Sequence, residues 1–482
     1  MNSLVKRVFE VYVFAFAFFF ASRPLSDGDF WFHLKTGEYI FKTGLIPRTD
    51  LFSFTNYGIP WIAHGWLSGV IFYGVYSRLG FNALIFIFAV LTAVAFWIAY
   101  RRSNAHPFVR GFAMLLGVWT VLPNIGVRPR VFTLLFASIY LAVLNRYARR
   151  GTGRLICLLV PLMVLWANLH GAFLIGLALV ALTMLGILAD AWCTGERLRP
   201  MLPRLGVLGL ILLGCTLAAL INPYGIGIYS ETIEILRSPV YQQATVDWLS
   251  PDFHQPELFP LTLLVLLTVG ALALSPKRAK PSELLLFLAL VYATLKMQRN
   301  AMVFALVAVP LLADSLQNWL AATPFGQMSE KPESSTRGAG AVLASLLMLL
   351  PLVAFAAKLK AKVYSPPPQA VLKVPVKAVE YLKAKQITGN TLTDPNIWGG
   401  YLIWELPSNP VYFDGRGLYP EPFVNEYLGI TQGTRDWRGP FERYGVSVVV
   451  VELNSPLGRQ LQESSDWRQV YEDEMALVFT KD

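Results

Sequence analysis

Long apolar segments recur along most of this chain, and they constrain its fold more than any other feature. Of the 482 residues, 55% are hydrophobic and 15% are charged, whereas a soluble domain is about 45–50% apolar and about 25% charged. A helix needs roughly 17–25 residues to cross a hydrocarbon core about 30 Å thick. The sequence therefore predicts a polytopic α-helical membrane protein. The first segment lacks a small-residue cleavage site, so we expect a retained helix.

The apolar segments predict about eleven transmembrane helices. They fall at residues 8–22, 83–100, 108–125, 131–147, 155–168, 171–192, 206–221, 259–275, 282–297, 301–318 and 341–357. Residues 64–80 are also apolar and either cross the membrane or lie flat on it as an amphipathic helix. If they lie flat, the basic loops all fall on one side, which the positive-inside rule makes cytoplasmic. We therefore expect a multi-pass protein of the cytoplasmic membrane, with a cytoplasmic N-terminus and an outer C-terminal tail.

The composition changes after a Pro-rich hinge at Ser365–Pro368. Residues 1–360 are predicted to form the transmembrane domain, with outer juxtamembrane helices at 28–80, and residues 361–482 a soluble extracytoplasmic α/β domain. In this tail, helical patterns at 376–385, 397–405, 420–429 and 455–463 alternate with strand patterns at 391–393, 411–413, 446–451 and 476–479. The net charge of +10 lies mainly in the predicted cytoplasmic loops. That placement indicates contact with membrane lipids and no nucleic-acid partner.

A pair of carboxylates, Asp27 and Asp29, directly follows the first predicted span. Carboxylates at the edge of a membrane are costly to desolvate unless they hold a metal, a phosphate or a proton. The alternative role is a surface turn or the N-cap of a helix over residues 30–42. His33 lies four residues after Asp29, so the two share one helix face and could relay a proton or complete a metal site. Lys35 follows on the same segment.

The same predicted outer loop carries a series of short motifs. They are Asp27-x-Asp29, Gly37–Glu38–Tyr39–Ile40, Thr43–Gly44–Leu45–Ile46–Pro47, Asp50–Leu51–Phe52–Ser53–Phe54–Thr55, Gly58–Ile59–Pro60–Trp61, Trp66–Leu67 and Leu79–Gly80. This arrangement resembles the GT-C superfamily of polytopic membrane glycosyltransferases, and within it the bacterial mannosyltransferase and aminoarabinose-transferase branch. The resemblance implies a GT-C-like helical core and transfer of a sugar from a polyprenyl-phosphate donor. The acceptor would be a glycan, a lipid or a protein, and the transfer would take place at the outer face of the membrane.

Such a reaction needs a base for the acceptor hydroxyl and stabilisation of the departing phosphate. Asp27 and Asp29 are the candidate catalytic residues. Alternatively, the pair holds a divalent cation, Mg or Mn, through oxygen ligands. Members of this branch usually carry a further acidic residue in the second outer loop, but residues 124–130 are basic and contain no carboxylate. Either Asp27 and Asp29 carry the chemistry alone, or this chain has changed or lost catalysis.

Five further residues are candidate substrate ligands. Arg128 and Arg130 are predicted on the outer side, where a lipid phosphate suits a guanidinium group and where contact with lipid headgroups is the alternative. Arg299 lies at another predicted outer helix end. His64 and Trp66 begin the interfacial segment and could line a sugar subsite. With His33 and Lys35, these residues complete the predicted substrate site.

Two other functions remain open at the level of sequence. A transporter of a lipid-linked precursor should show internal repeats and broken helices, and no repeat is evident. A non-catalytic membrane scaffold on a degenerate GT-C core would account for the basic second loop. Substitution of Asp27 and Asp29 separates the glycosyltransferase from the scaffold, because only the enzyme requires these carboxylates.

Overall fold

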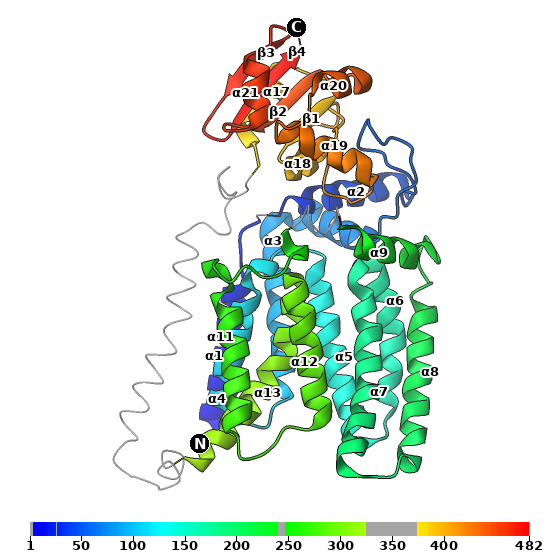
Figure 1. Cartoon of the computed structure of the whole chain (residues 1–482), viewed down its shortest axis with the longest axis vertical. Helices are drawn as coiled ribbons and strands as arrows, with labels where there is room; N and C mark the ends of the chain where they lie inside the picture. The colour runs from blue at the N-terminus through cyan, green and yellow to red at the C-terminus, as the bar shows by residue number, and fades with distance from the viewer. Residues whose placement is uncertain (1–2, 26, 240–245, 324–373, 482) are drawn as a thin grey trace, which may run out of the picture. The chain divides into compact units, whose positions relative to one another are not determined.

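The computed structural model describes residues 3–25, 27–239, 246–323 and 374–481 (Figure 1). Their packing divides the chain into two compact units. The helical unit comprises Met1–Arg23, Ile85–Asn222 and Val246–Val363, and the mixed unit comprises Pro24–Leu84, Pro223–Thr245 and Tyr364–Asp482. The predicted span at 341–357 and the Pro-rich hinge lie outside the described residues.

Every other predicted span coincides with a helix of the helical unit. These helices are α1 (Ser3–Ala21), the later part of α3 (Trp66–Arg101), α4 (Pro107–Val121), α5 (Arg130–Arg150), α6 (Leu159–Leu169), α7 (Leu174–Thr194), α8 (Leu202–Ala218), α11 (Phe259–Leu274), α12 (Pro281–Lys296) and α13 (Ala301–Ala322). Short 3₁₀ turns connect them: η1 (Leu122–Asn124), η2 (Arg154–Leu158), η3 (Gly171–Phe173), η4 (Arg199–Met201), η5 (Val246–Trp248), η6 (Pro256–Leu258) and η7 (Gln298–Asn300). Among the described residues, 6 helical stretches are long and apolar enough to cross a membrane. The chain is thus a multi-pass membrane protein, and the count of eleven spans stays a prediction.

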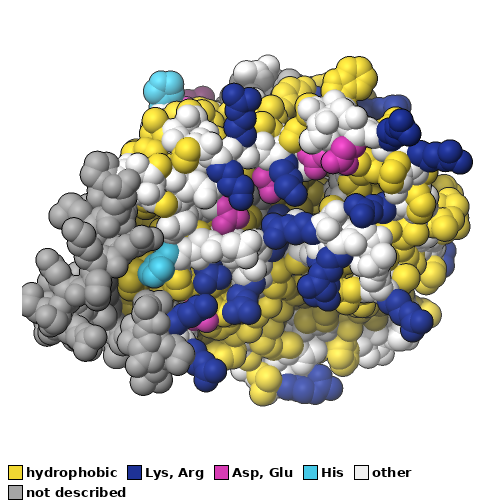
Figure 2. Space-filling model, turned by 90° about the horizontal axis from the view of Figure 1, so that it is seen from below, with side chains coloured by type: hydrophobic (Ala, Val, Ile, Leu, Met, Phe, Trp, Pro, Cys, Tyr) yellow, Lys and Arg dark blue, Asp and Glu magenta, His cyan; other side chains and the backbone are white. Residues whose placement is uncertain are grey.

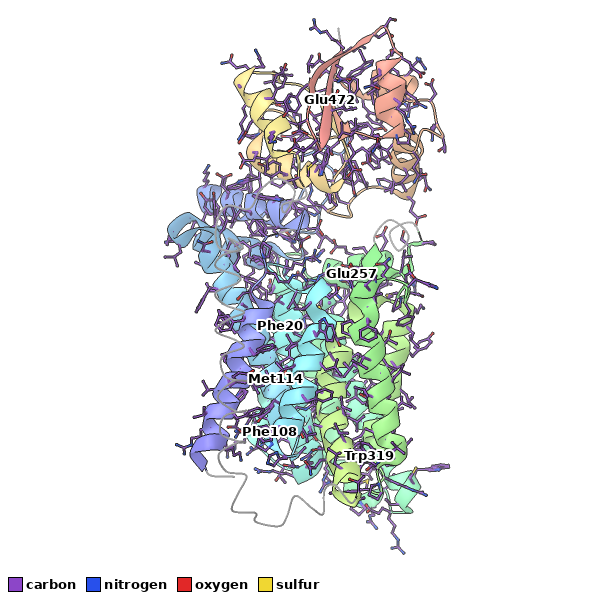
Figure 3. All side chains as sticks on the ribbon, turned by 90° about the vertical axis from the view of Figure 1, so that its left-hand side faces the viewer. Phe20, Phe108, Met114, Glu257, Trp319 and Glu472 are labelled. Atoms are coloured by element: carbon purple, nitrogen blue, oxygen red, sulfur yellow. The ribbon has the colours of Figure 1, made fainter. Side chains whose placement is uncertain are left out.

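Helix α13 lies at the centre of this unit and packs against α4, α5, α11 and α12. Its residues from Ala301 to Ala313 are all buried, because a run of Ala and Val lets neighbouring helices approach closely. Helix α1 packs on α4, where Gly111 leaves room for the ring of Phe9; Figure 3 labels Phe108 and Met114 along α4. Large side chains on α8, by contrast, are exposed: Leu210 is 70% exposed. An exposed Leu on an apolar helix is typical of a surface that faces lipid.

The basic loops predicted to share one side do lie together at one end of the helical unit. Ser103 donates a hydrogen bond to Asp314 at 2.7 Å, and Ser282 donates one to Asp190 at 2.8 Å, so the loops after α3 and α11 meet the ends of α13 and α7. Seen from this end, Lys and Arg side chains gather across the surface and few acidic ones accompany them (Figure 2). Their cytoplasmic placement stays a prediction.

The mixed unit contains α2 (Asp29–Thr43), the start of α3, α9 (Gly227–Arg237) and the C-terminal α/β domain. That domain consists of α17 (Val376–Ala384), β1 (Thr391–Asp394), α18 (Ile397–Glu405), α19 (Glu421–Thr431), α20 (Arg438–Tyr444), β2 (Val448–Glu452), α21 (Pro456–Gln462), β3 (Trp467–Glu472) and β4 (Ala476–Lys481). The strand order is β1-β2-β4-β3. Strand β1 runs parallel to β2, and the other two pairs are antiparallel.

Two details differ from the sequence-based expectations. Residues 411–413 form no strand, and Val411 makes only isolated bridges to Ser53 and Thr391. Strand β3 and helix α20 were not predicted. The predicted helix over residues 64–80, by contrast, is present: it begins at Trp66 and is separated from the later part of α3 by a kink. The chain leaves helical geometry at Gly80, where φ is 73°. A glycine tolerates this left-handed conformation, and the predicted boundary falls at the same place.

Candidate functional site

The acidic pair lies at the start of α2, in the mixed unit. Gly28 occupies the N-cap position without a side-chain cap, and Asp29 is the first residue of the helix. Asp27 accepts a hydrogen bond from the Asp29 backbone N–H at 3.3 Å. Neither aspartate is the N-cap residue, but the hydrogen bond from Asp29 N–H to the Asp27 side chain is a local turn of the kind that the structural alternative expects. A carboxylate in the first turn lies where the helix dipole favours negative charge.

Glycines hold this acidic turn tightly against the C-terminal domain. A Cβ on Gly28 would lie 2.8 Å from Cβ of Ile397, and one on Gly400 would lie 2.7 Å from the Gly28 carbonyl oxygen. A Cβ on Gly415 would lie 2.6 Å from Oδ1 of Asp29. A Cβ at Gly28 or Gly400 would therefore displace the backbone, whereas one at Gly415 would displace the Asp29 carboxylate. The close approach of α2 and α18 thus depends on these glycines.

The turn after Phe413 is fixed by a buried ion network. Arg416 contacts Asp50 and Asp414, each at 2.7 Å, and all three side chains are 0% exposed. The guanidinium also lies over the Trp61 ring, 4.8 Å from its centroid. Burial alone would lower the pKa of Arg416, but the charge of Asp414, then Tyr419 and Asp50, raises it. The Asp414–Gly415–Arg416 segment therefore joins the tail to the predicted first outer loop.

Four predicted substrate ligands also belong to the mixed unit. Burial, and then the charge of His64, lowers the pKa of His33 to about 3, so this imidazole is neutral near pH 7. Lys35 forms an ion pair with Glu38 at 2.8 Å, and His64 lies 3.3 Å from Glu231. Trp66 begins α3. A neutral His33 can accept or donate a hydrogen bond but does not bring a positive charge to a phosphate.

The three predicted arginines converge in the helical unit. Arg130 lies 2.5 Å and Arg128 3.9 Å from the Asp247 carboxylate. Arg299 lies over the Trp248 ring, 4.1 Å from its centroid. The Gln298 backbone N–H donates to the Leu249 carbonyl at 2.9 Å, so the loop at η5 is held against η7. We call Arg128, Arg130, Asp247 and Arg299 the arginine cluster.

Asp247 is the member of this cluster that is not among the predicted site residues. Burial raises the pKa of Asp247, but the charges of Arg130, Arg128 and Arg299 and a hydrogen bond from Arg130 lower it overall. The basic loop at 124–130, which contains no carboxylate of its own, thus receives one from a loop more than a hundred residues further along the chain. Only the acidic and aromatic character of residues 247–252 could have pointed to it.

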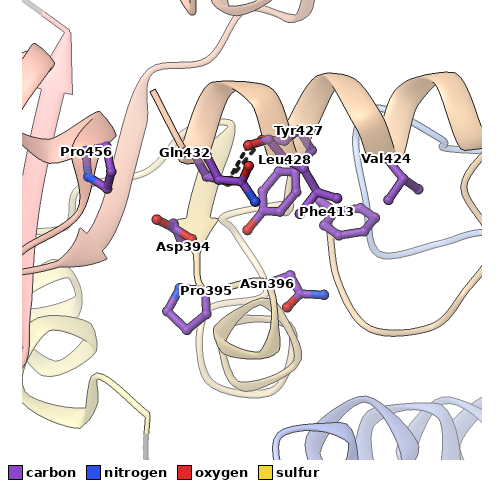
Figure 4. Close-up of a pocket in the computed structure, with 10 residues that line it drawn as sticks. Asp394, Pro395, Asn396, Phe413, Val424, Tyr427, Leu428, Gln432 and Pro456 are labelled. Carbon is purple, nitrogen blue, oxygen red and sulfur yellow. Dashed lines mark hydrogen bonds between the residues drawn. The ribbon is translucent and has the colours of Figure 1, made fainter. Parts of the chain in front are cut away.

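A pocket of about 460 Å³ opens at the end of β1 in the C-terminal domain. Figure 4 shows Asp394, the last residue of β1, with Pro395 and Asn396 after it, together with Tyr427 on α19 and Gln432 directly after that helix. Burial raises the pKa of Asp394 to about 6, although Ser455 donates to its carboxylate at 3.0 Å and opposes the rise. The sequence predicts the strand at 391–393 and the helix at 397–405 on either side of these residues but not the pocket between them.

The metal proposal can be compared with the side chains present. Among the described residues, no group of three or more His, Cys, Asp or Glu side chains could hold a metal ion. A cation would therefore depend on Asp27 and Asp29. Carboxylate oxygens suit Mg²⁺, which keeps several waters when it binds to one or two carboxylates.

Comparison with solved structures identifies similar folds. The archaeal oligosaccharyltransferase AglB from Archaeoglobus fulgidus, in complex with an inhibitory peptide and a dolichol-phosphate, is 12% identical, with a TM-score of 0.56. That match covers 93% of this chain and 70% of AglB. The arabinofuranosyltransferase AftD from Mycobacteria is 13% identical, with a TM-score of 0.54, over 100% of this chain and 42% of AftD.

No protein-family model matches the chain, and no curated protein matches its sequence significantly. At 12–13% identity the structural likeness shows the fold. The chain therefore shares the fold of AglB and AftD, which agrees with the helical core that the sequence resemblance implies. Its membership of the GT-C superfamily as an enzyme, and its branch there, stay predictions.

Proposed function

We propose that the chain is a glycosyltransferase that moves a sugar from a polyprenyl-phosphate donor to a glycan, lipid or protein acceptor. One observation carries the proposal: the arginine cluster lies at a helix end of a GT-C fold, where three guanidinium groups surround Asp247. Arginine binds phosphate oxygens bidentately, and Asp247 keeps Arg128 and Arg130 together before a phosphate arrives. The AglB structure holds a dolichol-phosphate, a lipid phosphate of the required class.

In this proposal, different residues bind the phosphate, accept the proton and contact the sugar or the acceptor. The arginine cluster binds the phosphate and stabilises the negative charge that develops as the bond between the sugar C1 and the phosphate oxygen breaks. Asp27 or Asp29 accepts the proton of the acceptor hydroxyl as its oxygen forms the new bond to C1. If Asp27 and Asp29 instead hold Mg²⁺ or Mn²⁺, these two carboxylates would be its protein ligands, and the cation would supply a positive charge to a substrate oxygen. His33, Lys35, His64 and Trp66 would contact the sugar or the acceptor.

The proposed reaction takes place at the outer face of the cytoplasmic membrane. The basic loops that meet at one end of the helical unit support this orientation, because Lys and Arg are retained on the cytoplasmic side. The N-terminus would then be cytoplasmic and the C-terminal domain extracytoplasmic.

A non-catalytic scaffold is the second candidate, and the packing of Asp29 favours it. The approach of Gly415 to Asp29 Oδ1 gives this carboxylate a structural contact within the protein. A scaffold would tolerate Asp29→Asn, because asparagine keeps the shape and an oxygen at the same contact. An enzyme that uses this carboxylate as its base would not.

Binding of a lipid phosphate tests the proposed function. We expect undecaprenyl phosphate to bind the purified full-length protein in native mass spectrometry, with at least about 10-fold weaker binding after Arg130→Gln or Arg299→Gln. Arg278→Gln is the matched control, because Arg278 is exposed in the loop at the opposite end of α12. Equal affinity of all three variants and the unaltered protein would reject the arginine cluster as the phosphate site.

A further inference from the structure

The pocket at the end of β1 has the chemistry of a ligand site that the proposed reaction does not use. Two aromatic rings, Phe413 and Tyr427, form its apolar part, and both are at most 5% exposed. Asp394, Asn396, Thr431 and Gln432 contribute a carboxyl group, two amides and a hydroxyl group. An aromatic surface next to groups that both donate and accept hydrogen bonds suits a ligand with apolar faces and hydroxyl edges.

The charge of the lining restricts the ligand further. Among the described residues that line the pocket, Asp394 is the only ionisable acid or base besides Tyr427, and none is Lys or Arg. A phosphate or a carboxylate would meet the Asp394 carboxylate without a cation to bind it. The lining therefore disfavours anionic ligands and suits a neutral, hydroxylated one.

The position of the pocket in the fold agrees with ligand binding. Strand β1 pairs in parallel with β2, from Thr391 opposite Val448 to Asp394 opposite Val451. Helix α18 begins at Ile397 and helix α21 at Pro456, each shortly after one of these strands. Ligands of α/β sheets bind in the crevice beyond the carboxyl ends of such parallel strands. Asp394 ends β1 at this crevice, where it also accepts a hydrogen bond from Ser455 on the segment that follows β2.

We propose that this pocket binds a neutral saccharide between the rings of Phe413 and Tyr427 and the polar side chains of Asp394, Asn396 and Gln432. A pocket of about 460 Å³ is within the roughly 300–1,000 Å³ of small-ligand sites. The apolar face of a pyranose lies on the aromatic rings, while its hydroxyl groups exchange hydrogen bonds with the carboxyl and amide groups. Saccharide binding at this site does not depend on the arginine cluster or on catalysis.

Saturation-transfer NMR on the full-length protein in nanodiscs tests the proposal. The probes are methyl α-mannoside, arabinose, glucose and N-acetylglucosamine, with ethanolamine and inorganic phosphate as charged comparisons. At least one saccharide should receive saturation, and Asn396→Ala and Gln432→Ala should each weaken its binding at least about 10-fold. Gln462→Ala, which removes an exposed amide on α21, should leave binding unchanged.

Three outcomes would overturn the proposal. They are no saturation of any saccharide, saturation that neither pocket variant reduces, and saturation of ethanolamine or phosphate alone. Gln432 is exposed at the mouth of the pocket, so its variant should fold even if Asn396→Ala does not. Asp29→Asn should retain saccharide binding, which separates this proposal from the proposed glycosyl transfer.

Discussion

Replacement of Arg416 by methionine should open the contact between the predicted first outer loop and the C-terminal domain. The change leaves the carboxylates of Asp50 and Asp414 buried without the guanidinium that both contact at 2.7 Å. Removal of one partner from a fully buried ion pair costs about 3–5 kcal/mol. At about 1.4 kcal/mol for each factor of ten, this corresponds to at least about 100-fold faster opening.

Hydrogen exchange provides the assay, because the backbone of Val411 reports on this contact. Its N–H donates to the Phe52 carbonyl at 3.3 Å, and its carbonyl accepts from the Phe54 N–H at 3.2 Å. The Val411 amide should exchange at least about 100-fold faster in Arg416→Met than in the unaltered protein. Addition of Asp50→Asn and Asp414→Asn should restore part of the protection, since both buried charges are then removed.

Arg438→Met is the matched control. Arg438 pairs with Asp436 at 3.1 Å, but both side chains are more than 60% exposed. Such a surface pair contributes about 0–1 kcal/mol, so Val411 exchange should stay within about a factor of five of its original rate. If Arg416→Met had no larger effect than Arg438→Met, the buried network would not hold these segments together.

Two further substitutions test the packing and the titration of the mixed unit. Gly37→Ala should destabilise the mixed unit by about 1–3 kcal/mol, because the new Cβ would lie 2.0 Å from the Gly69 carbonyl oxygen. The melting temperature of this variant should fall. That of the control Gly206→Ala should not, because no atom lies within 4 Å of a Cβ at Gly206. In hydrogen exchange, Asp394→Asn should raise the free energy of opening of the β1–β2 amides by up to about 3 kcal/mol at pH 8. It should leave this free energy unchanged near pH 4. Folding raises the pKa of Asp394 from 3.8 to about 6, mainly through burial, so its stabilising contribution is present below pH 3.8 and lost as the pH rises through 6. The hydrogen bond from Ser455 lowers the pKa of Asp394 and the charge of Glu452 raises it. Asp466→Asn, at an exposed position, is the matched control and should leave the protection of the β1–β2 amides unchanged.

Hydropathy was sufficient to locate the helices, because a span must satisfy its backbone internally and keep apolar side chains outside. Sequence patterns also located α2, α17 and α18, and most of β2, which is an unbroken run of valines typical of a buried strand. Strand β3 was not predicted, because it is an exposed edge strand and its residues Arg468, Gln469 and Glu472 supply little apolar pattern. Local pattern carries no information about such a strand's partner.

The contacts of the Arg416 network and of the arginine cluster are even harder to predict from sequence. Arg416 and Asp50 are 366 positions apart, and each looks unremarkable in its own segment. Arg130 and Asp247 likewise come from different loops that only the packing of η5 on η7 brings together. Sequence could select Arg128, Arg130 and Arg299 by their unusual placement, but only the fold identifies the carboxylate that gathers them.

The central claim is sugar transfer that depends on the carboxylates at the start of α2. The most direct test is the mass of the envelope glycans from cells that lack the gene, complemented with the unaltered chain or with the Asp27→Asn Asp29→Asn variant. The account predicts that deletion removes the mass of one sugar residue, that the unaltered chain restores it, and that the variant does not restore it although it accumulates normally in the membrane. Full restoration by the variant would contradict glycosyl transfer by these aspartates and favour the scaffold.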